Sequence, residues 1–264
     1  MIMEGPMAFS TGFESYLDNI GEMRNTGWEI SLNGVLVNRP DFRWDVTVMA
    51  STQNNEVLKL TPEAKEIIGG STIVREGLPV NTFYLPKFAG VDPATGAALY
   101  WAYDTDDKGN ITNEYVTSDT GKATSSRYLM GSRIPDLFGS IGTNLQWKGI
   151  DFSILTTYSI GGKVLDYIYA GAMNPFYYGQ TYHSHLTRAW QKPGDITDVP
   201  RVEVGTSSIT SDRFLVDASY FAIKNITIGY TIPQKAASYI GMKHVRVYCS
   251  MDNLALFTHL KGMN

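Results

Sequence analysis

Apolar and polar residues alternate along several long segments of this 264-residue chain. A period of two places successive side chains on opposite faces of a β-strand, so each segment predicts a strand with one apolar and one polar face. Between Ile223 and Ile226 the apolar parity changes, which predicts a β-bulge near Lys224 and Asn225. The six segments, in chain order, are residues 27–38, 41–54, 137–147, 150–160, 219–232 and 244–254.

Charged residues follow the same division between faces. In segment 41–54 the apolar face consists of Phe42, Trp44, Val46, Val48 and Ala50. The opposite faces of three segments carry Glu29, Ser31 and Asn33; Arg43, Asp45 and Thr47; and Asp151, Ser153 and Thr157. A barrel lumen accepts such residues, whereas a lipid-facing surface excludes charge. Lys224 is the exception, and a position near an extracellular rim would let its side chain reach water.

The predicted strands are about 11–14 residues long, which is roughly twice the mean strand of soluble proteins. With a rise of ~3.3 Å per residue and a tilt of ~40°, they span roughly 28–35 Å, the height of a bilayer's hydrocarbon layer. A soluble β-sandwich or lipocalin-like barrel also alternates, but its strands are usually shorter and its outer face more charged. Strand length and periodicity favour the membrane barrel, with the soluble β-domain as the alternative.

Short and long connections alternate between these strands. Tight turns are predicted at residues 38–41 and 148–149, and a modest link with one helical turn at 233–243. Residues 55–135 and 161–218 are long connections rich in Gly, Pro, Asp, Ser and Tyr. Outer-membrane barrels alternate short periplasmic turns with long extracellular loops. The sequence therefore predicts an all-β fold: a partial transmembrane antiparallel β-barrel of about six long strands, forming an open curved sheet with long extracellular loops.

Composition narrows the function classes. The net charge is −4, and charged residues make up 18% of the chain, below the roughly 25% of soluble domains. No basic footprint exists, which excludes a nucleic-acid partner gathered by bulk charge. A single cysteine excludes an intrachain disulfide framework. The chain has no apolar run of the ~18 residues that a membrane helix requires, and its start does not have the pattern of a signal peptide.

Two clusters suggest metal binding only superficially. Residues 104–110 begin like a calcium loop, but Lys108 occupies a ligand position and the twelfth position is Tyr115, so the bidentate acid is missing. We expect a turn that joins a small hairpin, 99–103 with 111–116. His183 and His185 have no evident third ligand, and we expect solvated loop histidines. We find no catalytic arrangement and expect no enzyme activity, no cofactor and no metal.

Aromatic residues gather in the second long connection. Flat rings pack against the apolar faces of sugars, and tyrosine hydroxyls add directional hydrogen bonds. Packing between loops, or contact with a lid protein, uses the same residue types. Residues 190–201, stiffened by Pro and bent by Gly, either hold the loop's shape or contact substrate. Arg201 and Arg213 have Asp195, Asp198 and Asp212 within pairing distance along the sequence. The candidate substrate-binding residues are Phe176, Tyr177, Tyr178, Tyr182 and Trp190.

Several blocks together resemble one known family. Four blocks are similar to the C-terminal barrel portion of SusC/RagA-type TonB-linked outer-membrane transporters. They are NIGEMRNTGWEI (19–30), the region 190–201, SDRFLVDASYFAIKNITIGYTIP (211–233) and VRVYCSMDNLALFT (245–258). Residues 128–162, which end in a Gly-Gly pair, fit as well. The resemblance covers nearly the whole chain, and the blocks occur in the family's order.

The resemblance implies a barrel of about 22 strands, occluded by an N-terminal plug and capped by a SusD-like lipoprotein. Such transporters sit in the outer membrane, contact its lipid, and import oligosaccharides or peptides with energy from the TonB system. We expect residues 1–264 to be the C-terminal part of such a barrel, without the plug, most of the barrel or the last strands. The alternative is a soluble β-rich carbohydrate-binding or surface adhesion module, which would not require detergent.

Overall fold

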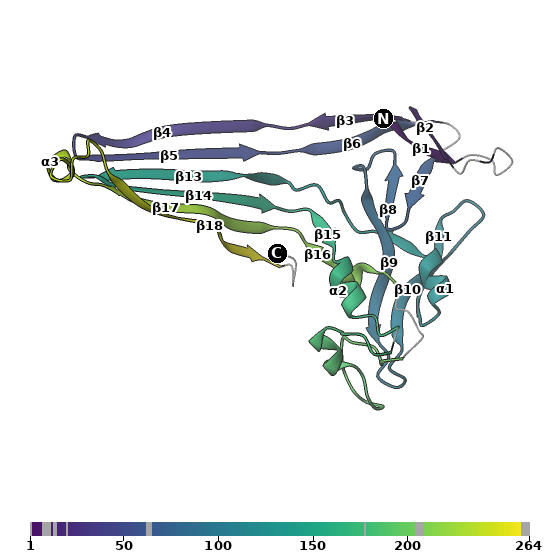
Figure 1. The fold of residues 1–264 in the computed structure, drawn as a ribbon. Helices are drawn as coiled ribbons and strands as arrows, with labels where there is room; N and C mark the ends of the chain where they lie inside the picture. The colour runs from purple at the N-terminus through teal and green to yellow at the C-terminus, as the bar shows by residue number, and fades with distance from the viewer. Residues whose placement is uncertain are drawn as a thin grey trace.

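Six long antiparallel strands form the larger part of the computed structural model, which describes residues 2–6, 12, 15–19, 21–61, 65–176, 178–203 and 209–259. Their order in the sheet is β18-β17-β14-β13-β5-β4 (Figure 1). All six predicted strands are confirmed, within a few residues at each end. Their bounds are Glu29–Arg39 (β4), Phe42–Ser51 (β5), Leu137–Trp147 (β13), Ile150–Ile160 (β14), Tyr220–Thr231 (β17) and Arg246–Thr258 (β18).

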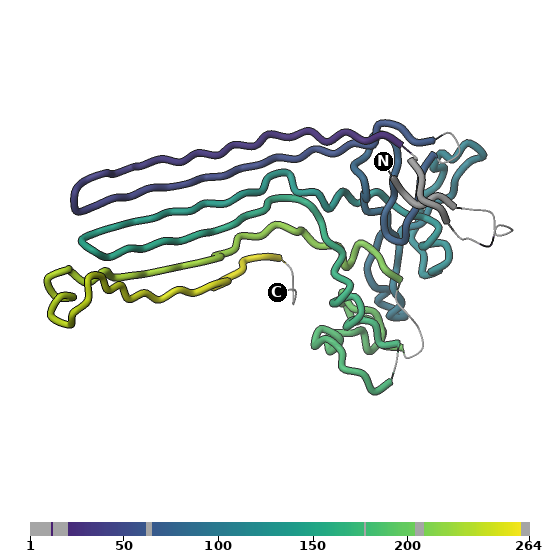
Figure 2. Tube along the Cα trace, turned by 45° about the horizontal axis from the view of Figure 1, so that its top comes forward, coloured from purple at the N-terminus to yellow at the C-terminus, as the bar shows by residue number. Residues whose placement is uncertain are grey.

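The alternation of short and long connections is also confirmed. At one end of the sheet, β4 turns into β5 through Pro40 and Asp41, and β13 turns into β14 through Lys148 and Gly149. Lys148 and Gly149 have φ angles of 46° and 89°, which suit the two-residue hairpin turn whose twist matches that of the strands. The third link contains the predicted helical turn, α3 (Gln234–Ser238). Both long connections leave and return at the opposite end (Figure 2).

The predicted β-bulge lies in β17. Pairing of β17 with β18 shifts register between Ile223 and Asn225, and pairing with β14 shifts at the same place. Lys224 donates a hydrogen bond to Asn253 Oδ1, 3.3 Å away on β18. The extra residue restores the alternation, so Ile223 and Ile226 point to the same face of the sheet.

Cross-strand pairing places the apolar residues of all six strands on one face. Directly opposed residues share a face, and rows such as Val46, Thr143, Ile154, Ile226 and Met251 run across the strands. No second layer of described residues covers this face: Leu32 is 62% exposed, Ile228 52% and Val247 64%. Each of β4 and β18 pairs with one neighbour only in the described sheet. The sheet is therefore open at both edges and apolar on an uncovered face.

Several polar atoms on the apolar face are hydrogen-bonded within the sheet. The indole of Trp44 donates to Thr143 Oγ1 at 2.8 Å, and that hydroxyl donates to the backbone oxygen of Asp45. Thr156 donates to Ile141 O at 3.0 Å, and Tyr158 to Met49 O at 3.1 Å. A surface that faces hydrocarbon requires such internal partners, because no water is present to replace them.

The opposite face is polar and linked across strands. Asp45 accepts hydrogen bonds from Arg43 and Asn144. Arg246 on β18 reaches over β17 to Asp151 on β14, with Nε 3.0 Å from Oδ1. Gly229 lies between them, and a Cβ atom there would come within 2.7 Å of both side chains. The absence of a side chain at Gly229 thus leaves room for the ion pair.

Both long connections contain short strands and helices. The predicted hairpin is confirmed as β10 (Ala98–Thr105) with β11 (Ile111–Thr117). No helix in the described part of the chain is long and apolar enough to cross a bilayer. The first connection, or first insert, also contains β6 (Asn54–Leu60), β7 (Glu66–Gly69), β8 (Thr72–Arg75), β9 (Thr82–Val91), α1 (Thr120–Ser125) and β12 (Arg127–Leu129).

The helices and strands of the second insert are mostly shorter than those of the first. It contains β15 (Lys163–Leu165), α2 (Tyr167–Ala172), η2 (Ser184–Arg188), η3 (Asp212–Phe214) and β16 (Leu215–Asp217). Near the N-terminus, β3 (Gly21–Thr26) pairs with β6 and prolongs the β4–β5 hairpin, while β1 (Ile2–Pro6) pairs with β2 (Ser15–Asn19).

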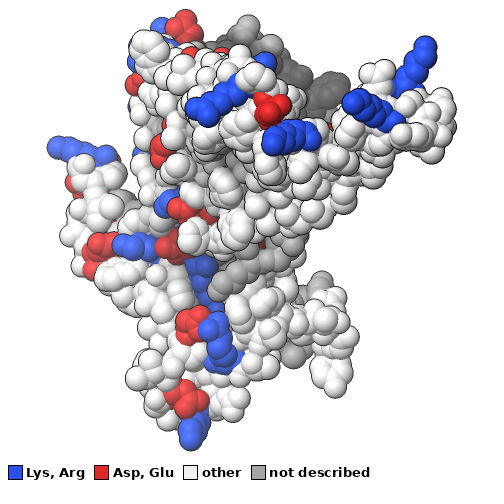
Figure 3. All heavy atoms as spheres, turned by 90° about the vertical axis from the view of Figure 1, so that its left-hand side faces the viewer, with Lys and Arg blue, Asp and Glu red and all other residues white. Residues whose placement is uncertain are grey.

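The two inserts share one hydrophobic core. Phe83 and Leu85 come from the first insert, and Met173, Val199 and Phe214 from the second; each is at most 3% exposed. Burial of these side chains from water holds the inserts together as a single unit at one end of the sheet (Figure 1). Figure 3 views the molecule from the other end of the sheet and shows both acidic and basic side chains on the visible face.

Candidate functional site

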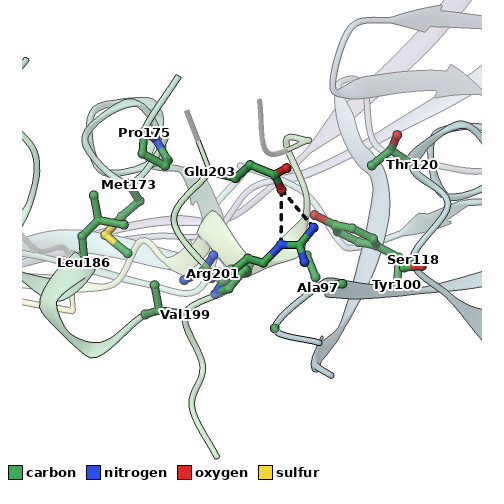
Figure 4. A pocket seen from close by; sticks show the side chains of 14 residues that line it. Ala97, Tyr100, Ser118, Thr120, Met173, Pro175, Leu186, Val199, Arg201 and Glu203 are labelled. Atoms are coloured by element: carbon green, nitrogen blue, oxygen red, sulfur yellow. Dashed lines mark hydrogen bonds and ion pairs between the residues drawn. The ribbon is translucent and has the colours of Figure 1, made fainter. Parts of the chain in front are cut away.

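A cleft of about 200 Å³ opens between the two inserts. The second insert contributes an apolar wall of Met173, Leu186 and Val199, and the first contributes Tyr100 from β10. Figure 4 shows the two sets of side chains on opposite sides of the ion pair between Arg201 and Glu203. The guanidinium nitrogens of Arg201 lie 3.1 and 3.2 Å from Glu203 Oε2.

Contacts between backbone and side chains hold the rim of the cleft. Arg201 N donates to Gly96 O at 2.9 Å, and its guanidinium donates to Thr95 O at 3.2 Å. The indole of Trp190 donates to Pro93 O at 2.9 Å. The turn that presents these oxygens is closed by Asp92, which accepts from Ala94 N and Thr95 Oγ1. Those hydrogen bonds, the Thr95 hydroxyl foremost, hold the pKa of Asp92 below its ordinary value of 3.8.

Gly96 is the position where the rim has no space for a side chain. Its φ is +73°, and an added Cβ would lie 2.4 Å from the indole ring of Trp190. We expect Gly96→Ala to displace that ring and to destabilise the rim by roughly 1–3 kcal/mol. Amide hydrogen exchange of residues 190–201 in the assembled protein measures the loss.

Gly109→Ala is the matched control for this substitution. Gly109 also has a positive φ, +81°, but nothing lies within 4 Å of its added Cβ. Its cost is expected to be that of backbone strain alone, with exchange in residues 190–201 unchanged. Equal exchange in the Gly96→Ala and unaltered proteins would show that the indole does not secure the rim.

Arg213 lies in the cleft without an ionic partner. Its guanidinium carbon is 5.3 Å from the ring centroids of both Phe88 and Phe214, and no carboxylate of the described residues lies within ion-pair distance of it. Burial lowers the pKa of Arg213, yet an arginine remains protonated at neutral pH. The cleft therefore contains a half-buried positive charge stacked on two aromatic rings.

Tyr100 is the second polar group of the cleft. The side chain is almost fully buried, at 3% exposure, and burial raises its pKa to about 12. The phenol is therefore neutral at physiological pH. Its hydroxyl makes no hydrogen bond to any residue of the described structure, so its O–H is available as a donor within the cleft.

Asp212 lies next to Arg213, and the titration of its carboxyl group has a predictable effect on the stability of the folded protein. Its Oδ1 accepts from Phe88 N at 2.7 Å, and burial raises its pKa above the ordinary 3.8. The folded protein thus binds the proton more tightly than the unfolded chain, so stability decreases as pH rises above about 4 through the folded pKa.

Asp212→Asn keeps the acceptor oxygen and removes this charge. We expect equal stability of the inserts in both proteins at pH 3 and higher stability of the variant at pH 7, measured by hydrogen exchange or denaturant titration. A variant that is less stable at pH 7 would show that the ionised carboxylate is net favourable at this position.

The aromatic residues predicted to bind substrate are not gathered in one place. Trp190 secures the rim through Pro93, in agreement with a shape-holding role for its segment. Tyr178 is 93% exposed, whereas Phe176 and Tyr182 are half-buried. Tyr177 lies outside the described residues. Contact of these side chains with substrate stays a prediction.

The prediction of solvated histidines is wrong. His183 and His185 are half-buried and pack with Tyr169 in a cluster of perpendicular rings, with His185 Nδ1 2.8 Å from the Tyr169 hydroxyl. Tyr169 in turn packs edge-on against Phe214 of the shared core, so the histidines lie beside that core. Within the described residues, no group of three or more His, Cys, Asp or Glu side chains is arranged to hold a metal ion.

The Asp-rich turn is confirmed as a turn. Asp106 accepts from Lys108 N, Asn110 N and Asn110 Nδ2, and these hydrogen bonds lower its pKa. The carboxylate is thus engaged in the local structure that its sequence pattern favours.

Sequence reasoning missed the centre of the cleft. It considered Asp195, Asp198 and Asp212 as possible ion-pair partners of Arg201 and Arg213. In the structure Arg201 pairs with Glu203, and Asp198 pairs with Arg188 at 3.4 Å. Tyr100 and Arg213 are brought together only by packing of the inserts. An arginine beside Phe214 in a block rich in apolar residues was the one local signal for this site.

Comparison with known proteins agrees with the fold. No family model matches the chain. The TonB-dependent receptor P3 of Formosa agariphila is 29% identical over 281 residues, covering 99% of this chain and 27% of the receptor. The TonB-dependent receptor SusC of Bacteroides thetaiotaomicron is 26% identical over 275 residues, covering 96% of this chain and 25% of SusC. The chain thus spans about a quarter of these curated relatives.

Solved structures give the same result in three dimensions. The RagAB peptide transporter matches with a TM-score of 0.83 and 26% identity, covering 99% of this chain and 29% of the matched chain. The 'open-open' state of the RagAB peptide importer matches with a TM-score of 0.76 and 25% identity. With its uncovered apolar face and open edges, the chain resembles, over nearly its whole length, a segment of the β-barrel of SusC/RagA-type TonB-dependent transporters.

Proposed function

We propose that residues 1–264 are the C-terminal part of the barrel of an outer-membrane importer that takes up oligosaccharides or peptides with a SusD-like lipoprotein and the TonB system. The apolar face of the sheet contacts lipid, and the polar face lines the lumen. The inserts stand on the extracellular side and form part of a vestibule in which substrate is held. Uptake itself depends on the plug, which we assign to the remainder of the protein.

The uncovered apolar face is the observation that carries this proposal. Large side chains such as Leu32, Ile228 and Val247 are more than half exposed, and several polar atoms among them are hydrogen-bonded within the sheet. A soluble module would cover such a face, because apolar patches of this extent drive association in water. The two open edges require further strands, since unpaired backbone groups in hydrocarbon cost several kcal/mol each.

The isolated chain separates this proposal from a soluble module. Expressed alone, residues 1–264 are expected to aggregate in buffer and to require detergent. Analytical ultracentrifugation with and without detergent measures this. A monodisperse monomer without detergent would favour the soluble carbohydrate-binding or adhesion module.

Uptake by cells tests the transport itself. Deletion of the gene that contains this segment should abolish uptake of one labelled substrate class, tested with oligopeptides and oligosaccharides in parallel. Complementation should restore uptake only in cells with an active TonB system. Co-purification of a SusD-like lipoprotein with the tagged transporter tests the partner. Normal uptake of both classes by the deletion strain would contradict the proposed role.

A further inference from the structure

The cleft between the inserts contains a positive charge that has no ion-pair partner among the described residues. Arg213 is stacked on Phe88 and Phe214 at 5.3 Å from each ring centroid. These ring contacts leave its N–H donors without an acceptor among the described residues. A partly buried charge without a counterion lowers stability. A ligand that supplies the counterion would remove this cost.

The acidic residues around Arg213 are engaged elsewhere. Glu203 pairs with Arg201, and Asp198 pairs with Arg188. Asp212 accepts the backbone N–H of Phe88 at 2.7 Å. The described structure therefore leaves Arg213 open to an anion from outside, and the hydroxyl of Tyr100 lines the same cleft without a hydrogen-bond partner.

The apolar wall and the volume of the cleft indicate which chemical group a bound anion would carry. Met173 and Val199 are 3% and 1% exposed, and Leu186 packs against them. At about 200 Å³ the cleft is smaller than the ~300–1,000 Å³ of sites that enclose a drug-sized ligand. It suits one terminal group of a longer molecule.

We propose that this cleft binds a carboxylate that carries an apolar substituent, with Arg213 as the anion anchor, Tyr100 as a second donor and the Met173–Leu186–Val199 wall around the substituent. A planar guanidinium matches a carboxylate with two parallel hydrogen bonds. The inference rests on the proposed import function and deepens it by naming the chemistry of one end of the ligand. The carboxyl terminus of a peptide and an acidic sugar are the two sources of such a group.

Binding of small probes to the intact transporter in detergent tests this proposal. We expect N-acetyl-leucine to bind at least tenfold more tightly than its uncharged amide, measured by calorimetry, because a charge-assisted hydrogen bond is lost in the amide. N-acetylglycine should bind about tenfold more weakly than N-acetyl-leucine, since it has no group for the apolar wall. Methyl glucuronide in parallel distinguishes the acidic sugar from the peptide terminus.

Variants locate the binding. Arg213→Gln should abolish the preference for N-acetyl-leucine over its amide, and Arg213→Lys should restore it in part. Lys192→Gln is the matched control, because Lys192 is an exposed cation of the same insert outside the cleft lining, and it should leave all affinities unchanged. Hydrogen exchange of residues 80–90 and 210–216 verifies that each variant is folded.

Three results would overturn the proposal. They are equal affinity of the unaltered transporter for N-acetyl-leucine and its amide, no detectable binding of any of the three carboxylate probes, and an unchanged preference in a folded Arg213→Gln variant. If Arg213→Gln does not fold, the comparison of acid with amide on the unaltered protein still decides. These outcomes are distinct from a failure of import, because binding in detergent requires neither the TonB system nor the lipoprotein.

Discussion

Phe214→Ala should separate the two inserts from each other. Phe214 is 2% exposed and lies in the core that joins Phe83 and Leu85 of the first insert to Met173 and Val199 of the second. Removing a buried phenylalanine side chain costs about 3–5 kcal/mol, from lost burial and the cavity that remains. Amide exchange around the core in both inserts should accelerate by a factor of roughly 100–3,000, at 1.4 kcal/mol for each factor of ten.

Phe257→Ala is the matched control, because Phe257 is 60% exposed on the apolar face of the sheet, outside the core of the inserts. Its exchange pattern in the inserts should match that of the unaltered protein. If Phe214→Ala accelerates exchange in the second insert alone, the inserts fold independently and the shared core does not stabilise the unit.

Ile154→Arg should disrupt assembly into the membrane, whereas Ser153→Arg should not. The two residues are neighbours in the middle of β14, but Ile154 opposes Thr143 and Ile226 on the apolar face, and Ser153 opposes Asn144 on the polar face. An arginine on the lipid face near the bilayer midplane costs about 2–4 kcal/mol, while substitutions on the lumen face affect selectivity more than stability.

Denaturant unfolding of the intact transporter in lipid vesicles measures both variants. The contrast between adjacent positions is the informative quantity, because it cancels the general cost of placing a long charged side chain in β14. Comparable destabilisation by both substitutions would contradict the assignment of lipid and lumen faces. A larger effect of Ser153→Arg would reverse it.

Strand positions were predictable because their signal is local. Alternation with a period of two requires only the identity of neighbouring residues, and it located all six strands and the bulge after Ile223, while the Asp-rich turn located the hairpin between β10 and β11. The turns at Pro40 and Gly149 were equally legible. Each of these features depends on backbone conformation within a few residues, which side-chain type strongly influences.

The cleft was not predictable for the opposite reason. Tyr100 and Arg213 belong to different inserts, and only the shared core brings them to one site. The hydrogen bond from the Trp190 indole to Pro93 of the other insert had no signal in the local sequence. His183 and His185 looked solvated and are packed against Tyr169. An isolated segment does not reveal which distant surface will cover its aromatic residues.

The sequence by itself determined where the long strands run, which of their faces is apolar, and that short and long connections alternate, because these properties are encoded by residues that are neighbours in the chain. Only the tertiary structure decided that the two long connections fold as one unit and leave Arg213 unpaired in a cleft between them. Packing of segments more than a hundred residues apart in sequence depends on the burial and shape of whole surfaces, which no local pattern records.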